Sequence, residues 1–435
     1  MTENMTGIST TTATATPPAV GESAPTPPQS TPTTTQSTPP AQSSPTSQSA
    51  PKRSDELQFH PSEHQYFGVE VELQILDRET GDLAPGAPRI LKACEQDGVM
   101  GMAAELMQSM LEVKTDICKN VDEAKQQLYT RLGRARNIAS SLGYELAMAS
   151  THPFHRTTTS TVFPAERYEK ILERLQWLTY QRVMFGLHVH VGMPDGDAAI
   201  GVINLLVRYL PHLIALSANS PFWQGVDTGL SSSRIALYRL LPHAGLPQYF
   251  ANWKEFRNYC RVMLDCQTIQ SFKDIYWDVR PRPDFGTIEV RVCDIPSTLT
   301  ETLRLVALVR SLVVFALRLV KENPRASSGA VRRHWIAVEN KWLATRYGMK
   351  ALYVRTPSGK RRPLAIDIAD LIEKLMPIAR ESGDDKYLAQ FKPIEKFEAG
   401  ADRQRKLFRE KGNWKNLALH LGELLANDLE TGKPA

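Results

Sequence analysis

Ionisable side chains at two-residue spacing recur in three short segments of the chain. They are Glu70 with Glu72, His188 with His190, and Glu289 with Arg291. Side chains two residues apart on a strand project from one face, ~7 Å apart, so each segment can present two such groups together. One pair alone fits the solvated face of a half-buried strand better than a site, because alternating charge is the usual exposed pattern. Recurrence in three segments, each with branched apolar residues between, favours a shared site.

A further acidic segment, residues 105–115, contains Glu105 and Glu112. Alternation at its end puts Met110, Glu112 and Lys114 on one face. Hard Mg²⁺ prefers oxygen ligands and keeps phosphate oxygens and waters around it, so a sheet face with several carboxylates indicates a magnesium-nucleotide site. The sequence has neither G-x-x-x-x-G-K-[ST] nor G-x-G-x-x-G, so an ATP site must be built without a P-loop or a dinucleotide-binding turn.

Histidines leave a second class of enzyme open. His152 with His155, and His188 with His190, raise the possibility of zinc. A zinc hydrolase of the amidohydrolase type would use His152, His188 and His190. The other candidate ligands are carboxylates, which favour hard oxygen-seeking ions over zinc. Stoichiometric zinc retained through purification would distinguish this alternative from a magnesium enzyme.

The elements that must position these residues follow from periodicity. Period-2 alternation predicts strands from Tyr66 and over Gly186–Gly192 and Gly286–Val292. Helical spacing predicts helices at Val121–Leu142, Tyr168–Tyr180 and Ala198–Ser217. Leu303–Val320 contains three arginines, so we interpret it as a buried or amphipathic helix and not a membrane span. Strand pieces separated by turns and by helices of unequal length predict an α+β fold with a largely antiparallel sheet.

Composition bounds the domain organisation and the function class. The chain has 435 residues, and 42% of them are apolar, enough for a sizeable core. Pro, Thr and Ser dominate residues 1–54, so we predict a disordered tail there. We predict one catalytic domain over 55–435, with 325–435 a mainly helical part. The mild net charge of +5 has no basic stripe, which argues against nucleic-acid binding and fits an enzyme with anionic substrates.

The cysteines and the N-terminus indicate a compartment. Five cysteines without a C-x-x-C pair favour reduced thiols, and no basic segment followed by an apolar one opens the chain. We therefore expect a cytoplasmic protein.

Seven ordered motifs resemble the carboxylate-amine ligases of the glutamate-cysteine ligase type 2 group over most of residues 60–380. The motifs are Phe67–Leu73, Gln108–Thr115, Thr151–Pro153, Gly186–Gly192, Ser233–Tyr238, Thr287–Arg291 and Asn340–Gly348. The resemblance implies a glutamine-synthetase-like fold, in which a curved, mainly antiparallel sheet flanked by helices forms a funnel for ATP and Mg²⁺. It also implies ATP-dependent amide formation through an acyl phosphate. Glutamate and cysteine are the plausible acid and amine, and a homodimer is the implied assembly.

Residue roles follow from the motif positions. Glu70 and Glu72 resemble metal ligands, with Glu105 and Glu112 completing one site and His188 and Glu289 another. Arg291 would face the phosphates, Arg234 would contact substrate or phosphate, and His190 and Arg346 would contact the nucleotide; a surface position is an equal alternative for Arg234. Trp342 and Tyr347 are expected in the core.

Two positions depart from the family pattern. Val71 and Lys114 stand where relatives commonly have a polar and a small apolar residue, respectively. A non-catalytic relative that kept the fold and ATP is the third alternative.

Overall fold

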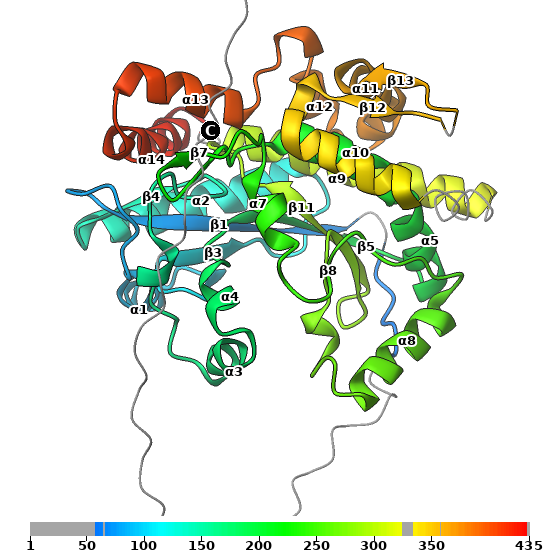
Figure 1. Cartoon of the computed structure of the whole chain (residues 1–435), viewed down its shortest axis with the longest axis horizontal. Coiled ribbons are helices and arrows are strands. Elements are labelled where there is room, and N and C mark those ends of the chain that lie inside the picture. Colours follow the sequence, from blue (N-terminus) through cyan, green and yellow to red (C-terminus); the bar gives the residue numbers. More distant parts are fainter. Residues whose placement is uncertain (1–56, 64–65, 324–333, 357, 433–435) are drawn as a thin grey trace, which may run out of the picture. The chain divides into compact units, whose positions relative to one another are not determined.

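The computed structural model describes residues 57–63, 66–323, 334–356 and 358–432 (Figure 1). All of them belong to one compact unit within Lys52–Ala435. The predicted tail at 1–54 lies outside the described residues, and the domain boundaries stay predictions.

A seven-stranded sheet forms the centre of the described fold. Its strand order is β10-β11-β5-β1-β3-β2, with β4 pairing with β1, and each neighbouring pair is antiparallel. The strands are β1 (Phe67–Asp77), β2 (Met102–Ala104), β3 (Met110–Lys114), β4 (Tyr144–Ala147), β5 (Gly186–Gly192), β10 (Val279–Arg282) and β11 (Thr287–Asp294). Val69, Val71 and Leu73 of β1 are all buried, as the alternation predicted. The three predicted strands and the antiparallel α+β class are confirmed.

Helices lie on both sides of this sheet (Figure 1). The described helices are α1 (Ala87–Gln96), α2 (Val121–Ser141), α3 (Glu166–Leu175), α4 (Trp177–Tyr180), α5 (Gly196–Leu206), α6 (Leu210–Ser217), α7 (Ser233–Tyr238), α8 (Trp253–Asp265), α9 (Leu299–Glu322), α10 (His334–Tyr347), α11 (Leu364–Glu381), α12 (Asp385–Ala389), α13 (Gly400–Lys411) and α14 (Trp414–Thr431). The long helix α9 contacts β5, α2, α5 and α11. In Figure 1, α9 to α14 lie above the edge of the sheet and α3, α4 and α8 lie below it.

Three short two-stranded sheets complete the described elements. They are β6 (Phe222–Trp223) with β7 (Val226–Asp227), β8 (Ala244–Gly245) with β9 (Tyr276–Trp277), and β12 (Leu352–Val354) with β13 (Arg361–Pro363). Apart from β12 and β13, helices dominate the described part of 325–435.

Two predicted helices are interrupted. Tyr168–Tyr180 divides into α3 and α4 at Gln176, whose φ of 47° no regular helix allows. Ala198–Ser217 divides at residues Val207–Tyr209, a 3-10 turn, after which Pro211 lies in the first turn of α6, where its missing N–H is tolerated. Gly196–Ser217 is long and apolar enough to cross a membrane by composition, but 78% of the 18-residue window that meets this criterion is buried inside the protein. Packing against α9 and the sheet therefore accounts for its apolarity.

The prediction that Trp342 and Tyr347 lie in the core is wrong. Their exposed fractions are 47% and 48%. Polar contacts orient α10 instead, because Asn340 bonds to the backbone of Val354 and Lys341 pairs with Asp278, all buried. These contacts turn the two aromatic rings outward.

Candidate active site

Strand register brings the predicted ligands onto one face of the sheet. Glu70 of β1 lies opposite Lys114 of β3 and His188 of β5, and Glu72 lies opposite Glu112. On the other side of β5, His190 lies opposite Glu289 of β11. Directly opposite residues share a face with Cβ atoms about 5 Å apart, so four adjacent strands contribute to a single polar surface.

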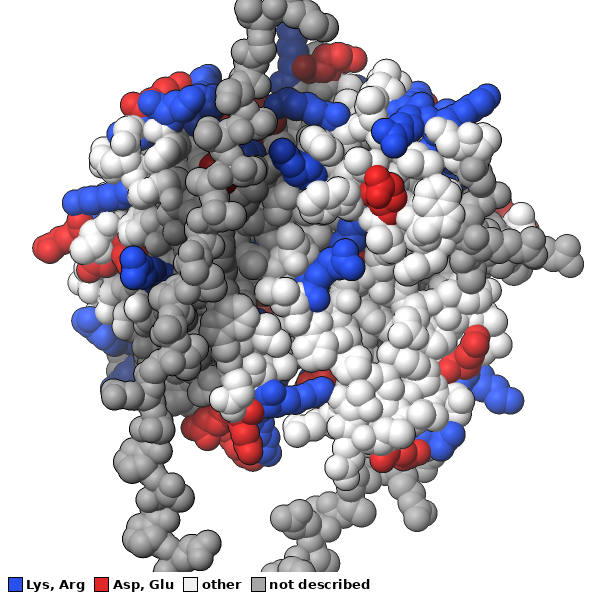
Figure 2. All heavy atoms as spheres, viewed as in Figure 1, with Lys and Arg blue, Asp and Glu red and all other residues white. Residues whose placement is uncertain are grey.

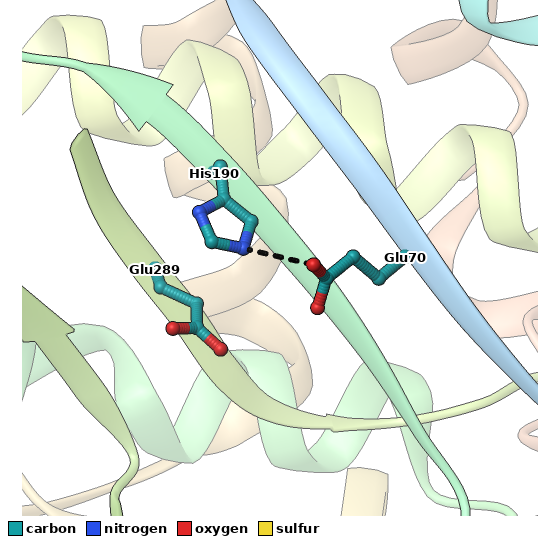
Figure 3. A group of neighbouring side chains, drawn as sticks. All are labelled: Glu70, His190 and Glu289. Carbon is teal, nitrogen blue, oxygen red and sulfur yellow. Dashed lines mark ion pairs between the residues drawn. The ribbon is translucent and has the colours of Figure 1, made fainter. Parts of the chain in front are cut away.

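Three groups of potential ligand atoms form on this surface, each with its atoms within 4.8 Å of one another. The outer group on the β11 side is Glu70, His190 and Glu289; the middle group is Glu70, Glu112 and His188; the outer group on the β3 side is Glu72, Glu105 and Glu112. Figure 3 shows the first group, in which the three side chains converge from β1, β5 and β11. All six residues predicted as metal ligands therefore lie together, with His190 in addition. The division among the groups differs from the predicted one, because Glu289 joins Glu70 and His190, whereas His188 joins Glu70 and Glu112.

Charges in the β3-side group are only partly compensated. Burial and the Glu105 carboxylate raise the pKa of Glu72 to about 8, and the same two causes hold the pKa of Glu112 well above its usual range. Burial opposes ionisation of Glu70, but the neighbouring rings of His188 and His190 outweigh it and lower its pKa. The site therefore combines ionised carboxylates with carboxylates that need a nearby cation to ionise.

Buried histidine nitrogens support a divalent cation at this site. His188 Nε2 and His190 Nε2 are buried and make no hydrogen bond to the described residues. A carboxylate oxygen of Glu72 lies 3.7 Å from the first, and one of Glu70 lies 3.6 Å from the second. Burial lowers the pKa of His188 to about 3, so its ring is neutral and can act as a ligand. The crowded carboxylate oxygens fit a hard divalent cation, and the neutral ring of His188 can add a nitrogen ligand to them.

Three guanidinium groups surround Glu289. Arg280, Arg282 and Arg291 all pair with its carboxylate, which is fully buried. Burial opposes ionisation of Glu289, but Arg291 and Arg280 outweigh it and hold its pKa well below the usual range. Arg291 also donates to Tyr238 Oη at 3.1 Å.

A cavity of about 370 Å³ lies over this polar surface. Five glutamates and eight Lys or Arg residues line it, a positive excess that suits anionic ligands. The cationic lining consists of Lys114, Arg167, Arg182, Arg234, Lys273, Arg280, Arg282 and Arg291. The outer face shown in Figure 2 has no such excess of one charge among its described residues, because acidic and basic side chains are interspersed on it.

Two further cavities adjoin the first. One, of about 410 Å³, has an apolar lining that includes Tyr66, Phe67, Ile117 and Phe285, and it shares Glu70, Lys114 and Phe285 with the first. His190 lines this second cavity. The other, of about 310 Å³, shares Arg167, Lys273 and Tyr276 with the first.

Arg234 and Arg346 occupy different environments. Arg234 lines the first cavity, is 3% exposed, and donates to the backbone oxygen of Arg291, so it is not a surface charge. Arg346 bonds to the backbone oxygen of Gly229 and does not line any of these three cavities. Its predicted contact with the nucleotide stays a prediction.

The histidines of the zinc alternative do not converge in the described structure. His152 Nε2 bonds to the backbone oxygen of Gly81, and His155 bridges Asp82 and Ser160. Neither belongs to a ligand group with His188 or His190 among the described residues. These contacts tie the loop after β4 to the turn after β1.

Sequence reasoning missed several cavity residues. Arg280 and Arg282 alternate in β10, so the period-2 rule applied to residues 279–282 would have placed them on the face of Glu289. Tyr238 lies four residues after Arg234, one helical turn on. Arg182, which lies over the ring of Tyr276, comes from an irregular segment, and Lys273 comes from the short 3-10 helix Phe272–Asp274; neither segment is long enough to carry a periodic signal.

The sequence is similar to that of known proteins. The sequence model of glutamate-cysteine ligase family 2 matches residues 66–420. A Thermobifida fusca protein provisionally named glutamate-cysteine ligase 2 is 39% identical over 383 residues, covering 87% of this chain and 94% of the relative. A Gloeobacter violaceus protein with the same provisional name is 39% identical over 359 residues, covering 81% and 95%.

Solved structures share the fold. The AMP complex of glutamate-cysteine ligase from Francisella tularensis matches with a TM-score of 0.61 at 13% identity, covering 84% of this chain and 89% of that one. A bifunctional glutathione synthetase from Pasteurella multocida matches with a TM-score of 0.57 at 15% identity, covering 84% and 51%. The predicted fold class is thus confirmed. The chain belongs to glutamate-cysteine ligase family 2.

Proposed function

We propose that this protein is an ATP-dependent carboxylate-amine ligase that forms an amide through an acyl phosphate. The observation that carries the proposal is the carboxylate-histidine surface lying against a cavity with eight cationic side chains. Phosphoryl transfer to a carboxylate joins two anions, so it needs positive charge fixed where the negative charge gathers. Divalent cations, held by the glutamate and histidine groups described above, would supply part of that charge.

The first step joins the acid to the γ-phosphate of ATP. A carboxylate oxygen forms a bond to the γ-phosphorus while the bond from that phosphorus to the β-γ bridging oxygen breaks, and ADP leaves. Arg280, Arg282 and Arg291 would neutralise the transferring group, because all three line the cavity and gather around Glu289. Burial of this region favours the acyl phosphate over its hydrolysis.

The second step transfers the acyl group. The amine nitrogen attacks the acyl carbon, the carbon-oxygen bond to phosphate breaks, and the nitrogen loses a proton. Tyr238 Oη lies in the cavity beside Arg291 and Arg234. Burial opposes ionisation of Tyr238, but Arg291 and Arg182 outweigh it and lower its pKa, which suits a group close to a proton transfer.

The apolar cavity is the proposed place for the adenine. Tyr66, Phe67, Ile117 and Phe285 offer flat or apolar contact surface. The shared lining at Glu70 and Lys114 leads from this cavity to the carboxylate surface. A nucleotide could therefore bind with its base in the apolar cavity and its phosphates over the carboxylates.

Glutamate and cysteine are the proposed acid and amine. The names of the relatives support this pair. Arg167, Arg182 and Lys273, on the side of the cavity away from the adenine, are suited to a second carboxylate on the acid.

The deciding experiment measures ADP and phosphate release with Mg²⁺, glutamate and cysteine, then with pools of other acids and amines. Hydroxylamine with each acid alone traps an acyl phosphate as a hydroxamate. Release that requires both an acid and an amine supports the proposal. ATP binding without phosphate release or hydroxamate under every mixture would identify a non-catalytic ATP-binding protein.

A matched pair of variants locates the chemistry. Arg291→Gln is expected to lower kcat about a hundredfold or more, as loss of one charge-stabilising donor does. Arg318→Gln is the control, because Arg318 pairs with Glu381 at the exposed surface of α9 and should leave kcat unchanged. Equal activity of the two variants would contradict the assigned site.

A further inference from the structure

Lys114 brings a permanent positive charge into the carboxylate surface. It lies opposite Glu70 in the β1–β3 register and two residues from Glu112 on β3. Its Nζ is 2.5 Å from Glu112 Oε2 and 3.4 Å from Glu70 Oε1. The ammonium therefore contacts both carboxylates of the middle ligand group.

The middle group has no carboxylate of its own. Glu70 also belongs to the group with His190 and Glu289, and Glu112 also belongs to the group with Glu72 and Glu105. Cations in the two outer groups would use the same two carboxylates. A divalent ion in the middle would then compete both for ligands already in use and with the ammonium for the same oxygens.

We propose that the Lys114 ammonium replaces a third divalent ion, which would otherwise bind to Glu70, Glu112 and His188. The chain accordingly binds two divalent ions, one in each outer group. The inference rests on the proposed function for the use of divalent ions at this surface.

Charge balance supports a lysine in this place. Three arginines already pair with Glu289, so the charges that lack an arginine partner within the described part of the chain are those of Glu70, Glu72, Glu105 and Glu112. The Lys114 ammonium contacts Glu70 and Glu112 and neutralises one of these four charges when all are ionised. A third divalent ion would add two more positive charges close to the ammonium, where no further carboxylate among the described residues lines the cavity.

Counting bound Mn²⁺ tests the inference. The full chain is titrated with Mn²⁺ alone, and free Mn²⁺ is measured by electron paramagnetic resonance; the titration is repeated with a non-hydrolysable ATP analogue. We expect two ions per chain for the wild type and for Lys114→Arg, which keeps the charge. For Lys114→Met, which removes it and keeps the length of the side chain, we expect three.

Three ions on the wild type, or two on Lys114→Met, would overturn the inference. Circular dichroism and thermal melting establish that each variant is folded. Because the titration needs no turnover, absence of ligase activity would contradict the proposed reaction and leave the ion count standing. Absence of any bound Mn²⁺ would contradict the metal site itself and the inference with it.

Acetylation of Lys114 gives a second measurement on the unaltered protein. The lysine side chain is 41% exposed, so a soluble acetylating reagent can reach it. If the ammonium stays on Glu70 and Glu112, saturation with Mn²⁺ leaves its acetylation rate, followed by mass spectrometry, unchanged or lower. A several-fold rise with Mn²⁺ would show that the ion displaces the lysine and would overturn the inference.

Discussion

At the scale of single residues, the buried carboxylate of Glu289 pairs with three guanidiniums, of which that of Arg280 is buried and those of Arg282 and Arg291 are half-buried. Glu289→Gln removes the charge and leaves Arg280, Arg282 and Arg291 facing one another. Because uncompensated buried charges are costly, we expect the free energy of unfolding to fall by roughly 3 to 5 kcal/mol. Urea unfolding of the variant and the wild type measures this.

Glu105→Gln is the contrasting change at the same surface. The Glu105 carboxylate adds to the effect of burial in raising the pKa of Glu72 and Glu112. Its replacement by an amide therefore removes charge repulsion from the cation-free protein. We expect unchanged or slightly higher stability in EDTA, together with weaker Mn²⁺ binding. Equal destabilisation by the Glu105 and Glu289 variants would contradict this account of the charges.

The raised carboxylate pKa values predict how stability depends on pH. The pKa of Glu72 is about 8 in the folded, cation-free protein, against about 4.3 in an unfolded chain. The folded state therefore binds more protons than the unfolded state between these values, and stability falls as pH rises. Buried His188 and His152, with lowered pKa values, act in the opposite sense, but only below about pH 6.5.

The informative window is thus pH 6.5 to 8. In EDTA we expect the free energy of unfolding to fall by up to about 1.4 kcal/mol per pH unit for each carboxyl group that is protonated in the folded state and ionised in the unfolded state. Mg²⁺ favours the ionised carboxylates, so the slope should disappear when it is present. Urea unfolding at several pH values, with EDTA or with Mg²⁺, measures both slopes, and identical slopes would count against a cation site here.

At the scale of elements, Gly186 at the start of β5 lets Arg234 lie across the strand. A Cβ at Gly186 would overlap the Arg234 guanidinium and come within 3.1 Å of His188 Nε2. We expect Gly186→Ala to lower stability by about 2 kcal/mol through overpacking, and to reduce kcat by moving Arg234. Gly133→Ala on α2, where a Cβ meets nothing within 4 Å, is the control and should stabilise by roughly 1 kcal/mol. Thermal melts and kcat of both variants make the comparison.

The break between α3 and α4 gives a second prediction at this scale. Gln176 has φ 47° and ψ −126°, a conformation that glycine adopts more readily than other residues. Gln176→Gly should therefore stabilise the protein by about 1 kcal/mol. Gln176→Ala also loses the side-chain bond to Glu173 but keeps the Cβ, so it should give no gain. A gain with both variants would mean that the backbone at 176 is not strained.

At the scale of the whole molecule, the described core and site use residues from 57 onward. Leu57 is 2% exposed in a cluster with Phe256 and Trp277, and the backbone of residues 60 and 62 bonds to the loops beside β10 and β5. We expect deletion of residues 2–50 to leave the melting temperature and kcat unchanged. Deletion of 2–65 should destabilise the protein by about 2 kcal/mol or more, because it removes a buried leucine and these bonds. Equal melting temperatures of the two truncations would contradict an anchoring role for 57–63.

Other properties of the whole molecule remain predictions. These are the cytoplasmic location and the homodimer. Light scattering on the purified protein measures the mass of the assembly directly.

Local sequence pattern was sufficient for much of the fold and of the site. Alternation determines which side chains share a strand face, so the sequence alone pairs Glu70 with Glu72 and His188 with His190. The ordered motifs added the family and the antiparallel sheet. The same pattern failed for Trp342 and Tyr347, because an apolar side chain on a helix is buried only if a neighbouring element covers it.

Only the tertiary structure decided how these faces meet. Register places Glu289 beside His190 and Lys114 beside Glu70, and register depends on pairing between segments far apart in the sequence. The gathering of the ligands and of the three arginines around Glu289 follows from that pairing, and the packing of α7 against β11 buries Arg234. Residue types and spacing determined that a carboxylate-rich sheet face exists, whereas the long-range packing of strands decided which charges neutralise one another.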